Sequence, residues 1–443
     1  MCRAQLLSVS HFMEQFYQYI WQHSLWQHFA DSRLVDGTPL KVLSPGLPNG
    51  DAGPDFFNAR ISAGGNLWAG NVEIHVNASD WMRHRHDGDP AYDSVILHVV
   101  GVDDMRIRRA DGSEIPQLLI SAPPSIMEAY GQLTAPGESK PCDSLFPSLS
   151  PLHRHEWLSR LGIERLQSKA KNALRILESL SGDWEQTCFT LLARSLGFGL
   201  NSEAFEVLAL NTPLSVLAHH SDNILQLEAI LFGQAGMLDP SVRIFDEYYQ
   251  LLCREYFFLA RKYSLRPPLK ASQWKYARTR PANFPHRRIA LLASLMEGGT
   301  HSLMSRIMDA DGEIDALELI FRHSVSSYWN THFSFDSASA WKPGLLSRGS
   351  LDSICVNAVA PLLYAYALHT SDATLADKAV AILYSIPAEK NSVTGGWKMR
   401  GVGSSSAFDS QALIHLYKNY CSLSRCFECR WGQRVFRNKI GGV

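Results

Sequence analysis

The chain has 443 residues, of which 46% are hydrophobic and 19% are charged, and its formal net charge is −1. These values predict a folded protein of two or three domains and exclude a disordered or strongly basic or acidic chain. The sequence shows neither an apolar run of about 18 residues nor a signal-like N-terminus, so we expect no membrane partner. Eight cysteines spread over this length indicate reduced thiols in the cytoplasm.

The chain begins with a helix pattern that is followed by a strand pattern. Aromatic residues at helical spacing predict an amphipathic helix over residues 11–30, with Glu14 in its first two turns. Residues 40–43 are short and apolar, which predicts a first strand. The start of the chain therefore has the pattern of an α/β domain.

A loop rich in proline, glycine and other small residues follows over residues 44–53. Small residues let a backbone approach a ligand closely. We expect this loop to bring Asn49 and Asp51 close to Asp55, which follows directly after a Pro.

Two polar side chains alternate with β-branched residues over residues 71–76. Side chains of a strand alternate between its faces, so Glu73 and His75 should lie on one face. The Ala-Gly-Gly-Asn sequence at 63–66 predicts a hairpin turn. Pairing about that turn places Asp55 opposite or diagonal to this face, roughly 5–8 Å away. The three side chains can then share one divalent cation.

Further elements follow in the same domain. Residues 79–90 predict a short helix that ends at Gly-Asp-Pro, and residues 94–100 predict a strongly apolar central strand. Residues 103–120 have the pattern of a closing hairpin with an Asp-Gly turn. Proline, serine and glycine recur over residues 121–151, which indicates a domain boundary.

Four histidines lie within 24 residues of this region: His75, His84, His86 and His98. His84 and His86 are two residues apart, so a helix would place them on different faces, whereas a loop can bring them together. One interpretation is that they line a polar groove with Asn71 and hydrogen-bond the carboxylates. The other is that they bind a metal directly.

The order of Pro54-Asp55, a hairpin, and then Glu73-Ile74-His75 resembles the PD-(D/E)XK signature of the restriction-endonuclease-like nucleases. The resemblance implies a core of helix, three strands, helix and strand. It also implies Mg²⁺ or Mn²⁺ held by Asp55 and Glu73, with Glu14 as an additional ligand by its position in the first helix. His75 would stand in place of the usual lysine and would position or deprotonate the attacking water.

The histidine departs from that signature, because imidazole is neutral over much of the physiological range and stabilises phosphate charge less than lysine does. Two alternatives to a metal-dependent nuclease therefore remain open. One is a catalytically inactive nuclease-like scaffold that binds nucleic acid or protein. The other is a zinc hydrolase built on His75, His84, His86 and His98.

The rest of the chain is rich in helix patterns. Helical spacing predicts helices at residues 155–180, 184–196, 204–210, 225–233, 241–263, 289–295, 315–323, 350–366, 374–386 and 407–420. The predicted fold class is thus α+β. A nuclease-like α/β domain at 1–145 precedes a helical domain at 146–443.

Residues 261–288 carry nine Lys and Arg residues, no acid and several interleaved aromatic residues. Such a segment attracts phosphate backbones and offers base-stacking surfaces, so we expect nucleic acid as a partner. The alternatives are arginines that pair with acids elsewhere in the fold, or the binding of another anion. The candidate nucleic-acid-binding residues are Lys275, Arg278, Arg280, Arg287 and Arg288.

Cys421, Cys426 and Cys429 form a cluster near the end of the sequence. Three thiols with this spacing are typical of a structural Zn²⁺ site or an iron–sulfur cluster, each of which needs a fourth ligand. Some nucleases of the resembled superfamily carry an iron–sulfur cluster on three C-terminal cysteines. Apolar packing of reduced thiols is the alternative. The candidates for the fourth ligand are His415, Cys142, Cys188, Cys253 and Cys355.

The chain as a whole resembles an uncharacterised bacterial family of unknown function. The landmarks are Gly-Pro-Asp-Phe, Val-Glu-Ile-His, Arg-x-Arg-Pro-x-Asn-Phe-Pro and the terminal cysteine cluster. This resemblance implies no activity.

Overall fold

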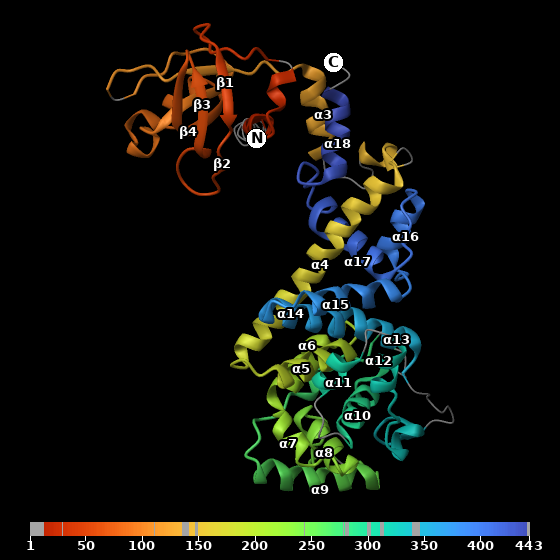
Figure 1. The fold of residues 1–443 in the computed structure, drawn as a ribbon. Coiled ribbons are helices and arrows are strands. Elements are labelled where there is room, and N and C mark those ends of the chain that lie inside the picture. The colour runs from red at the N-terminus through yellow and green to blue at the C-terminus, as the bar shows by residue number, and fades with distance from the viewer. Residues whose placement is uncertain are drawn as a thin grey trace. The chain divides into compact units, whose positions relative to one another are not determined.

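The chain folds into two compact units. Unit 1 consists of residues 1–149 and 418–443, and unit 2 consists of residues 150–417. Sequence patterns placed the C-terminal residues in the helical domain, whereas they belong to unit 1 (Figure 1). This computed structural model describes residues 13–28, 30–109, 111–134, 141–146, 149–242, 244–277, 279, 283–298, 303–310, 314–338 and 346–440.

A mixed sheet forms the centre of unit 1 (Figure 1). Its order is β1-β3-β4-β5-β6, and β2 also pairs with β3. The pairs β1–β3, β2–β3 and β3–β4 are antiparallel, whereas β4–β5 and β5–β6 are parallel. The strands are β1 (Leu40–Ser44), β2 (Leu47–Pro48), β3 (Phe56–Ala63), β4 (Asn66–Asn77), β5 (Val95–Val102) and β6 (Gln117–Leu119).

The turn between β3 and β4 confirms the predicted hairpin. Gly64 and Gly65 both have positive φ angles, 57° and 83°, and Ala63 pairs with Asn66. A two-residue turn with two positive φ angles matches the right-handed twist of the strands, and glycine adopts it without steric cost. The resulting register places Asp55, just before β3, beside the middle of β4.

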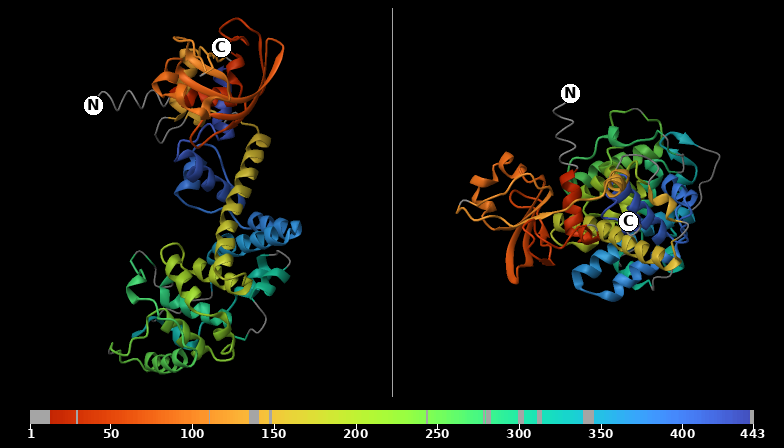
Figure 2. Two further views of the ribbon diagram at one scale, coloured as in Figure 1. Left: turned by 90° about the vertical axis from the view of Figure 1, so that its left-hand side faces the viewer. Right: turned by 90° about the horizontal axis from the view of Figure 1, so that it is seen from above.

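Helices complete unit 1. A helix over residues 13–22 buries Phe16, Ile20 and Trp21 in the same core as the sheet residues. α3 (Pro124–Thr134) and α18 (Arg430–Ile440) pack side by side (Figures 1 and 2). The short α2 (Asp80–Arg83) follows β4 and leads back to β5.

The predicted central strand is confirmed, and the predicted closing hairpin is confirmed only in part. Residues 95–100 are all buried, and β5 lies between β4 and β6. The amide of Ile115 donates to the carbonyl of Ile107 at 2.9 Å, as a hairpin requires. Residues 117–119 then leave that pairing and join β5 as a parallel strand.

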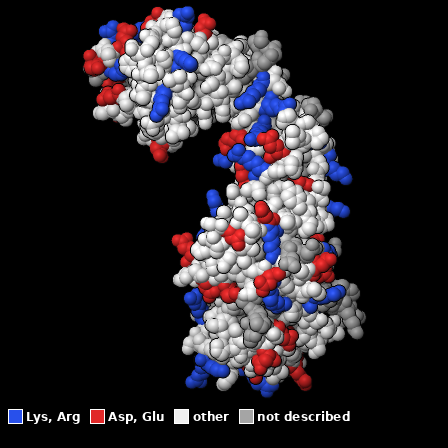
Figure 3. All heavy atoms as spheres, viewed as in Figure 1, with Lys and Arg blue, Asp and Glu red and all other residues white. Residues whose placement is uncertain are grey.

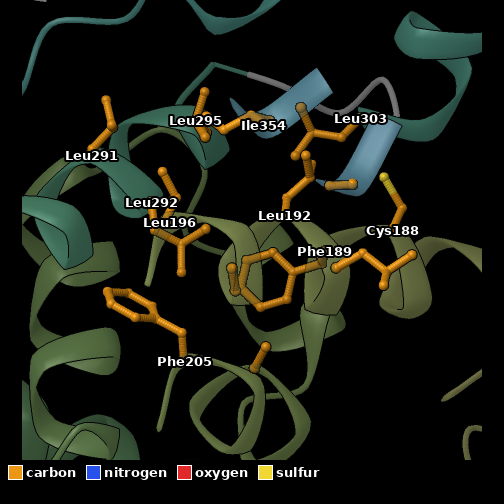
Figure 4. Close-up of a cluster of buried hydrophobic side chains, with 14 of the residues drawn as sticks. Cys188, Phe189, Leu192, Leu196, Phe205, Leu291, Leu292, Leu295, Leu303 and Ile354 are labelled. Carbon is orange, nitrogen blue, oxygen red and sulfur yellow. The ribbon is translucent and has the colours of Figure 1, made fainter. Parts of the chain in front are cut away.

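Unit 2 is almost entirely helical. Its core includes Phe189 and Leu192 from α5, Leu292 from α10 and Ile354 from α13 (Figure 4). The helices are α4 (Pro151–Ser179), α5 (Trp184–Leu196), α6 (Ser202–Asn211), α7 (Leu214–Ala218), α8 (Ile224–Gln234), α9 (Glu247–Lys262), α10 (Pro285–Met296), α11 (Leu303–Asp309), α12 (Ile314–Phe321), α13 (Arg348–Ile354), α14 (Ala360–Thr370), α15 (Ala373–Ser385), α16 (Ser392–Met399) and α17 (Ala407–Leu416). Two short strands, β7 (His332–Ser334) and β8 (Ser337–Ala338), form a separate pair.

One helical stretch in the described part of the chain, Arg348–Thr370, is long and apolar enough to cross a membrane. Within the fold, 72% of its most apolar window is buried in unit 2. Such burial is typical of a core helix.

A buried carboxyl group lies in the core of unit 2. Glu228, on α8, accepts hydrogen bonds at Oε2 from the Tyr248 hydroxyl and from Trp329 Nε1, both at 2.8 Å. Its other oxygen, Oε1, has no hydrogen-bond partner in the described residues. Burial raises the pKa of Glu228 to about 7, although these hydrogen bonds act in the opposite direction.

We therefore expect Glu228→Gln to remove a pH dependence of stability. Between the ordinary carboxyl pKa of 4.5 and about 7, the native state keeps a proton that the unfolded chain has lost. Stability contributed by this group is present below pH 4.5 and falls by about 3 kcal/mol as pH rises through 7. Urea unfolding at pH 5 and pH 8 should show a smaller decrease for Glu228→Gln than for wild type. An equal decrease in the two proteins would contradict the prediction, and Glu203→Gln on the surface of α6 serves as the control.

Candidate metal centre

Asp55 and Glu73 meet at the start of β3, as the hairpin register predicts. The amide of Asp55 donates to Glu73 Oε2 at 3.1 Å. Asp55 Oδ2 in turn accepts from the amide of Ile74 at 3.0 Å. Each carboxylate thus accepts a hydrogen bond from a backbone amide in the segment that carries the other. These two hydrogen bonds fix both carboxylates relative to the sheet.

Three histidines gather beside Glu73. His75 lies on the same face of β4 and is 1% exposed. His84 caps α2, and the next residue, Arg85, adopts a left-handed conformation with φ 63°. That conformation reverses the chain locally, so the side chains of His84 and His86 lie on the same side. In a continuous helix, two residues at this spacing would point in different directions.

The ligand atoms of these residues converge on one point. His75 Nε2 lies 3.2 Å from His84 Nδ1 and 3.6 Å from Glu73 Oε1, and His86 Nε2 lies 3.3 Å from the same oxygen. The nitrogens of the three histidines all lie within 4.8 Å of one another. Donor atoms about 2.1 Å from a tetrahedral Zn²⁺ are separated by about 3.4 Å. The three contacts of 3.2, 3.3 and 3.6 Å are close to the length of an edge of such a tetrahedron.

The centre has a closed side and an open side. On the closed side, His98 Nε2 lies 2.9 Å from His75 Nδ1, and Trp81 meets the His98 ring edge-on at 5.2 Å. Tyr92 stacks on His86 at 3.8 Å. On the other side, His84 is exposed to solvent. A substrate can therefore approach the ligand atoms from the direction of His84.

The His75–His98 contact fixes the orientation of the His75 ring. When His75 binds a cation through Nε2, its Nδ1 keeps the proton and donates it to His98 Nε2. His98 then carries its own proton on Nδ1, which has no partner in the described residues. This contact is therefore compatible with the tautomer of His75 that can act as a ligand.

The electrostatics of the centre suit a cation. Burial, with the neighbouring imidazoles, lowers the pKa of His75 to about 2, and burial lowers that of His98 to about 3. Both rings are therefore neutral, which is the ligand form of imidazole. Burial raises the pKa of the Asp55 and Glu73 carboxyls, and the neighbouring carboxylates raise it further. Two buried acids without a positive charge at their meeting point are costly.

The first helix also contributes to the centre. Glu14 is half-buried, and its charge raises the pKa of Asp55 and Glu73, so it lies within electrostatic range of both. Gln18, one turn later on the same face, donates to Asp55 Oδ1 at 2.8 Å. We did not predict Gln18, although its spacing of four residues from Glu14 was the available signal.

The other predicted groove residues hold the backbone in place. Asn49 donates to the carbonyl of Pro54 at 3.0 Å and accepts from the amide of Asp51 at 2.9 Å, so it shapes the loop before Asp55. Asn71 donates to the Ser94 hydroxyl at 2.8 Å and joins β4 to the start of β5. Asp51 itself is exposed.

The basic segment of unit 2 differs from the exposed loop that we predicted. Arg287 and Arg288 lie on α10 and are each only 7% exposed. Arg287 donates to the carbonyl of Trp329 and Arg288 donates to Asn283 Oδ1, so both serve the interior of the fold. Lys275 is exposed, whereas Arg278 and Arg280 lie outside the described residues.

The described surface shows no large area of one charge in the view of Figure 3, where basic and acidic residues are interspersed. Burial of Arg287 and Arg288 removes these two cations from any surface contact with a phosphate backbone. The prediction of nucleic-acid binding by this segment now depends on Lys275 among the described candidates.

The candidate ligands of the cysteine cluster are distributed over the two units. Cys142 belongs to unit 1 together with Cys421, Cys426 and Cys429. The other candidates belong to unit 2: Cys188, Cys253, Cys355 and His415. The cysteines in the described residues form no disulfide.

The fold and this centre describe a mixed α+β protein with a cluster of three histidines and two acids on its N-terminal sheet. The model of a family described as "Protein of unknown function (DUF2851)" matches residues 14–392, and the chain belongs to this family. No curated protein and no solved structure matches the chain. The match includes all residues of the centre and ends before the C-terminal cysteines.

Proposed function

We propose that unit 1 is a metal-dependent hydrolase that cleaves phosphodiester bonds in nucleic acid. The observation that supports this proposal is the convergence of His75, His84 and His86, with Glu73 Oε1 within 3.6 Å of two of these histidines and with His84 exposed to solvent. Here ring nitrogens of three histidines lie close together beside a carboxylate oxygen, and each of these atoms can present a lone pair. A divalent cation satisfies all of them at once.

The set of donors favours an ion that accepts imidazole. Three nitrogens and one carboxylate oxygen suit Zn²⁺ or Mn²⁺ better than Mg²⁺, which prefers an octahedral set of oxygens. We therefore propose Zn²⁺ or Mn²⁺ in place of the Mg²⁺ that the nuclease resemblance implies. His84 and His86 become ligands, which is the second of the two interpretations that the sequence left open.

Each side chain of the centre has a separate role in the proposed hydrolysis. Bound at this point, the cation would polarise the phosphoryl group and lower the pKa of a bound water. Glu73 and the three imidazoles hold it. Asp55 orients Glu73 through its amide, and each of its carboxylate oxygens keeps a lone pair for a water at the open side. Gln18 and the amide of Ile74 keep the Asp55 carboxylate in place.

Two observations support a phosphodiester as the substrate. The elements around Asp55, Glu73 and His75 follow the order helix, strands β1–β4, short helix and parallel strand, where the nuclease resemblance implies helix, three strands, helix and strand. In addition, Arg85 is exposed between the two loop histidines and makes no ion pair with the described residues. A guanidinium at this opening is suited to a phosphate oxygen.

His84→Ala tests the assignment of the ligands. Because this exposed imidazole contributes a ligand and little packing, the variant should fold normally and lose zinc or manganese affinity by at least about tenfold. Calorimetric titration with each ion measures the affinity, and cleavage of single- and double-stranded DNA and RNA measures the activity. His155→Ala, on α4, is the matched control. Unchanged affinity and cleavage in His84→Ala would exclude this centre.

A second candidate is an inactive nuclease-like scaffold that binds nucleic acid or protein. Two features favour it: no lysine follows Glu73 in the expected place, and both Asp55 oxygens already accept hydrogen bonds. A scaffold would bind nucleic acid without cleaving it in the presence of Zn²⁺ or Mn²⁺. Its binding would also be unchanged in Asp55→Asn, whereas the hydrolase would lose cleavage in that variant.

A further inference from the structure

The C-terminal cysteines lie in a segment that is folded by successive turns. The amide of Ser424 donates to the carbonyl of Cys421 at 3.2 Å, and the amide of Cys429 donates to that of Cys426 at 3.3 Å. A turn of this kind brings its first and last residues within about 7 Å. The Cys-x-x-Cys pair therefore has the backbone form of a metal-binding turn, and both of its thiols are buried.

The turn is fixed against the start of α18. A Cβ atom at Gly432 would lie 2.1 Å from the carbonyl oxygen of Cys426, so only glycine allows this close approach. The amide of Gln433 donates to the carbonyl of Cys429 at 2.9 Å. These contacts hold the cysteines in one position relative to the helix.

The chain brings a fourth cysteine to the same place from almost 280 residues earlier in the sequence. Cys142 lies in a short 3-10 helix, η4 (Pro141–Ser144), which packs against α18. Nearby, the ring of Phe146 meets that of Trp431 edge-on at 5.1 Å. Since α18 begins at the residue after Cys429, this packing brings Cys142 to the same end of unit 1 as the cysteine turn.

We propose that Cys142, Cys421, Cys426 and Cys429 together bind a thiolate-coordinated metal centre, either a single zinc ion or an iron–sulfur cluster. Four cysteines meet the ligand count of both. Cys188, Cys253 and Cys355 belong to unit 2, and Cys142 is the candidate that unit 1 supplies. Metal binding releases the thiol protons and replaces four weak S–H groups with strong bonds.

The spacing of the sulfurs bears on the choice between the two metals. Among the described residues, no three of these sulfurs lie within 4.8 Å of one another. A tetrahedral zinc site with Zn–S bonds of about 2.3 Å requires sulfurs about 3.8 Å apart. Zinc binding therefore requires the cysteine side chains to move closer together. An iron–sulfur cluster, which holds several irons, accommodates sulfurs that are farther apart. Either metal ties the end of the chain to the segment that follows α3.

The test uses the full chain with His84→Ala and His86→Ala, so that the proposed hydrolase centre contributes no metal. Protein purified without oxygen should contain either one zinc per chain or iron with acid-labile sulfide. Adding Cys142→Ser should lower that content at least tenfold, and Cys253→Ser, on α9, should leave it unchanged. Parent protein without zinc and iron, or full content in the Cys142→Ser protein, would overturn the proposal.

A second measurement does not depend on the folding of the cysteine variant. After removal of metal by a chelator, the parent protein is titrated with Co²⁺, which gives intense thiolate charge-transfer absorption in the near ultraviolet when cysteines bind it. We expect this absorption at one equivalent, with a higher unfolding temperature. For protein that contains zinc when purified, a titration without thiolate absorption would overturn the proposal; for protein that contains iron and sulfide, the metal content of the Cys142→Ser protein is the deciding measurement. Because both readouts exclude the histidine centre, failure here leaves the hydrolase proposal untouched.

Discussion

Replacing Glu73 by glutamine should weaken binding of Zn²⁺ or Mn²⁺ by more than about 100-fold and remove detectable cleavage. Loss of an outer hydrogen bond at a metal site already costs 10–100-fold, and this change removes a ligand charge. The amide nitrogen of glutamine would also donate a hydrogen bond to His86 Nε2, which lies 3.3 Å from Glu73 Oε1 in the wild type, and would compete with the metal for that lone pair. Calorimetric titration and a cleavage assay measure the two effects.

The control for this variant is Glu114→Gln. Glu114 is an exposed carboxylate that pairs with Arg108 at 3.0 Å, away from the centre. Exposed ion pairs contribute about 0–1 kcal/mol, so metal affinity and cleavage should equal those of the wild type. Normal metal binding by Glu73→Gln would show that the convergence of side chains at β4 has another purpose.

Gly236→Ala should destabilise unit 2 by about 2–5 kcal/mol. Gly236 ends α8 with φ 69°, and the amide of Met237 donates to the carbonyl of Phe232 at 3.0 Å in a Schellman motif. An added Cβ would lie 1.8 Å from the carbonyl oxygen of Leu269. The left-handed conformation costs about 1–2 kcal/mol, and the displacement of the backbone costs about 1–3 kcal/mol more.

Gly298→Ala separates the two costs. Gly298 has a similar φ angle of 73°, but an added Cβ would meet no atom within 4 Å. Its destabilisation should therefore be about 1 kcal/mol, from conformation alone. Urea unfolding of both variants, followed by far-ultraviolet circular dichroism, measures the difference. Equal effects would mean that the segment around Leu269 moves aside without cost.

The sheet of unit 1 could be predicted because its signals are local. The alternation of polar and β-branched residues around Glu73 and His75 has the period of a strand, and the glycines at 64 and 65 define the turn. Together they fix the register that brings Asp55 to Glu73. The core of unit 2 follows in the same way from the spacing of its leucines and aromatic residues.

Other features depend on contacts that are distant in sequence. The positive φ angle of Arg85 brings His84 and His86 together, and an arginine gives no sign of such a conformation. The basic segment appeared to be exposed because Arg287 and Arg288 are charged, but their partners are a carbonyl and an amide oxygen. The return of the C-terminal residues to unit 1 has no local signal.

This return has a consequence for protein synthesis. The ribosome makes the sheet of unit 1 first, then the 268 residues numbered 150–417, and only then the segment that carries α18. At a synthesis rate of about 5–20 residues per second, roughly 15–50 s pass between the synthesis of the sheet and that of α18. During that time the apolar surface that later receives Phe436 faces solvent or a chaperone. Nascent chains halted before residue 418 should therefore be more sensitive to protease within residues 1–149 than the finished protein.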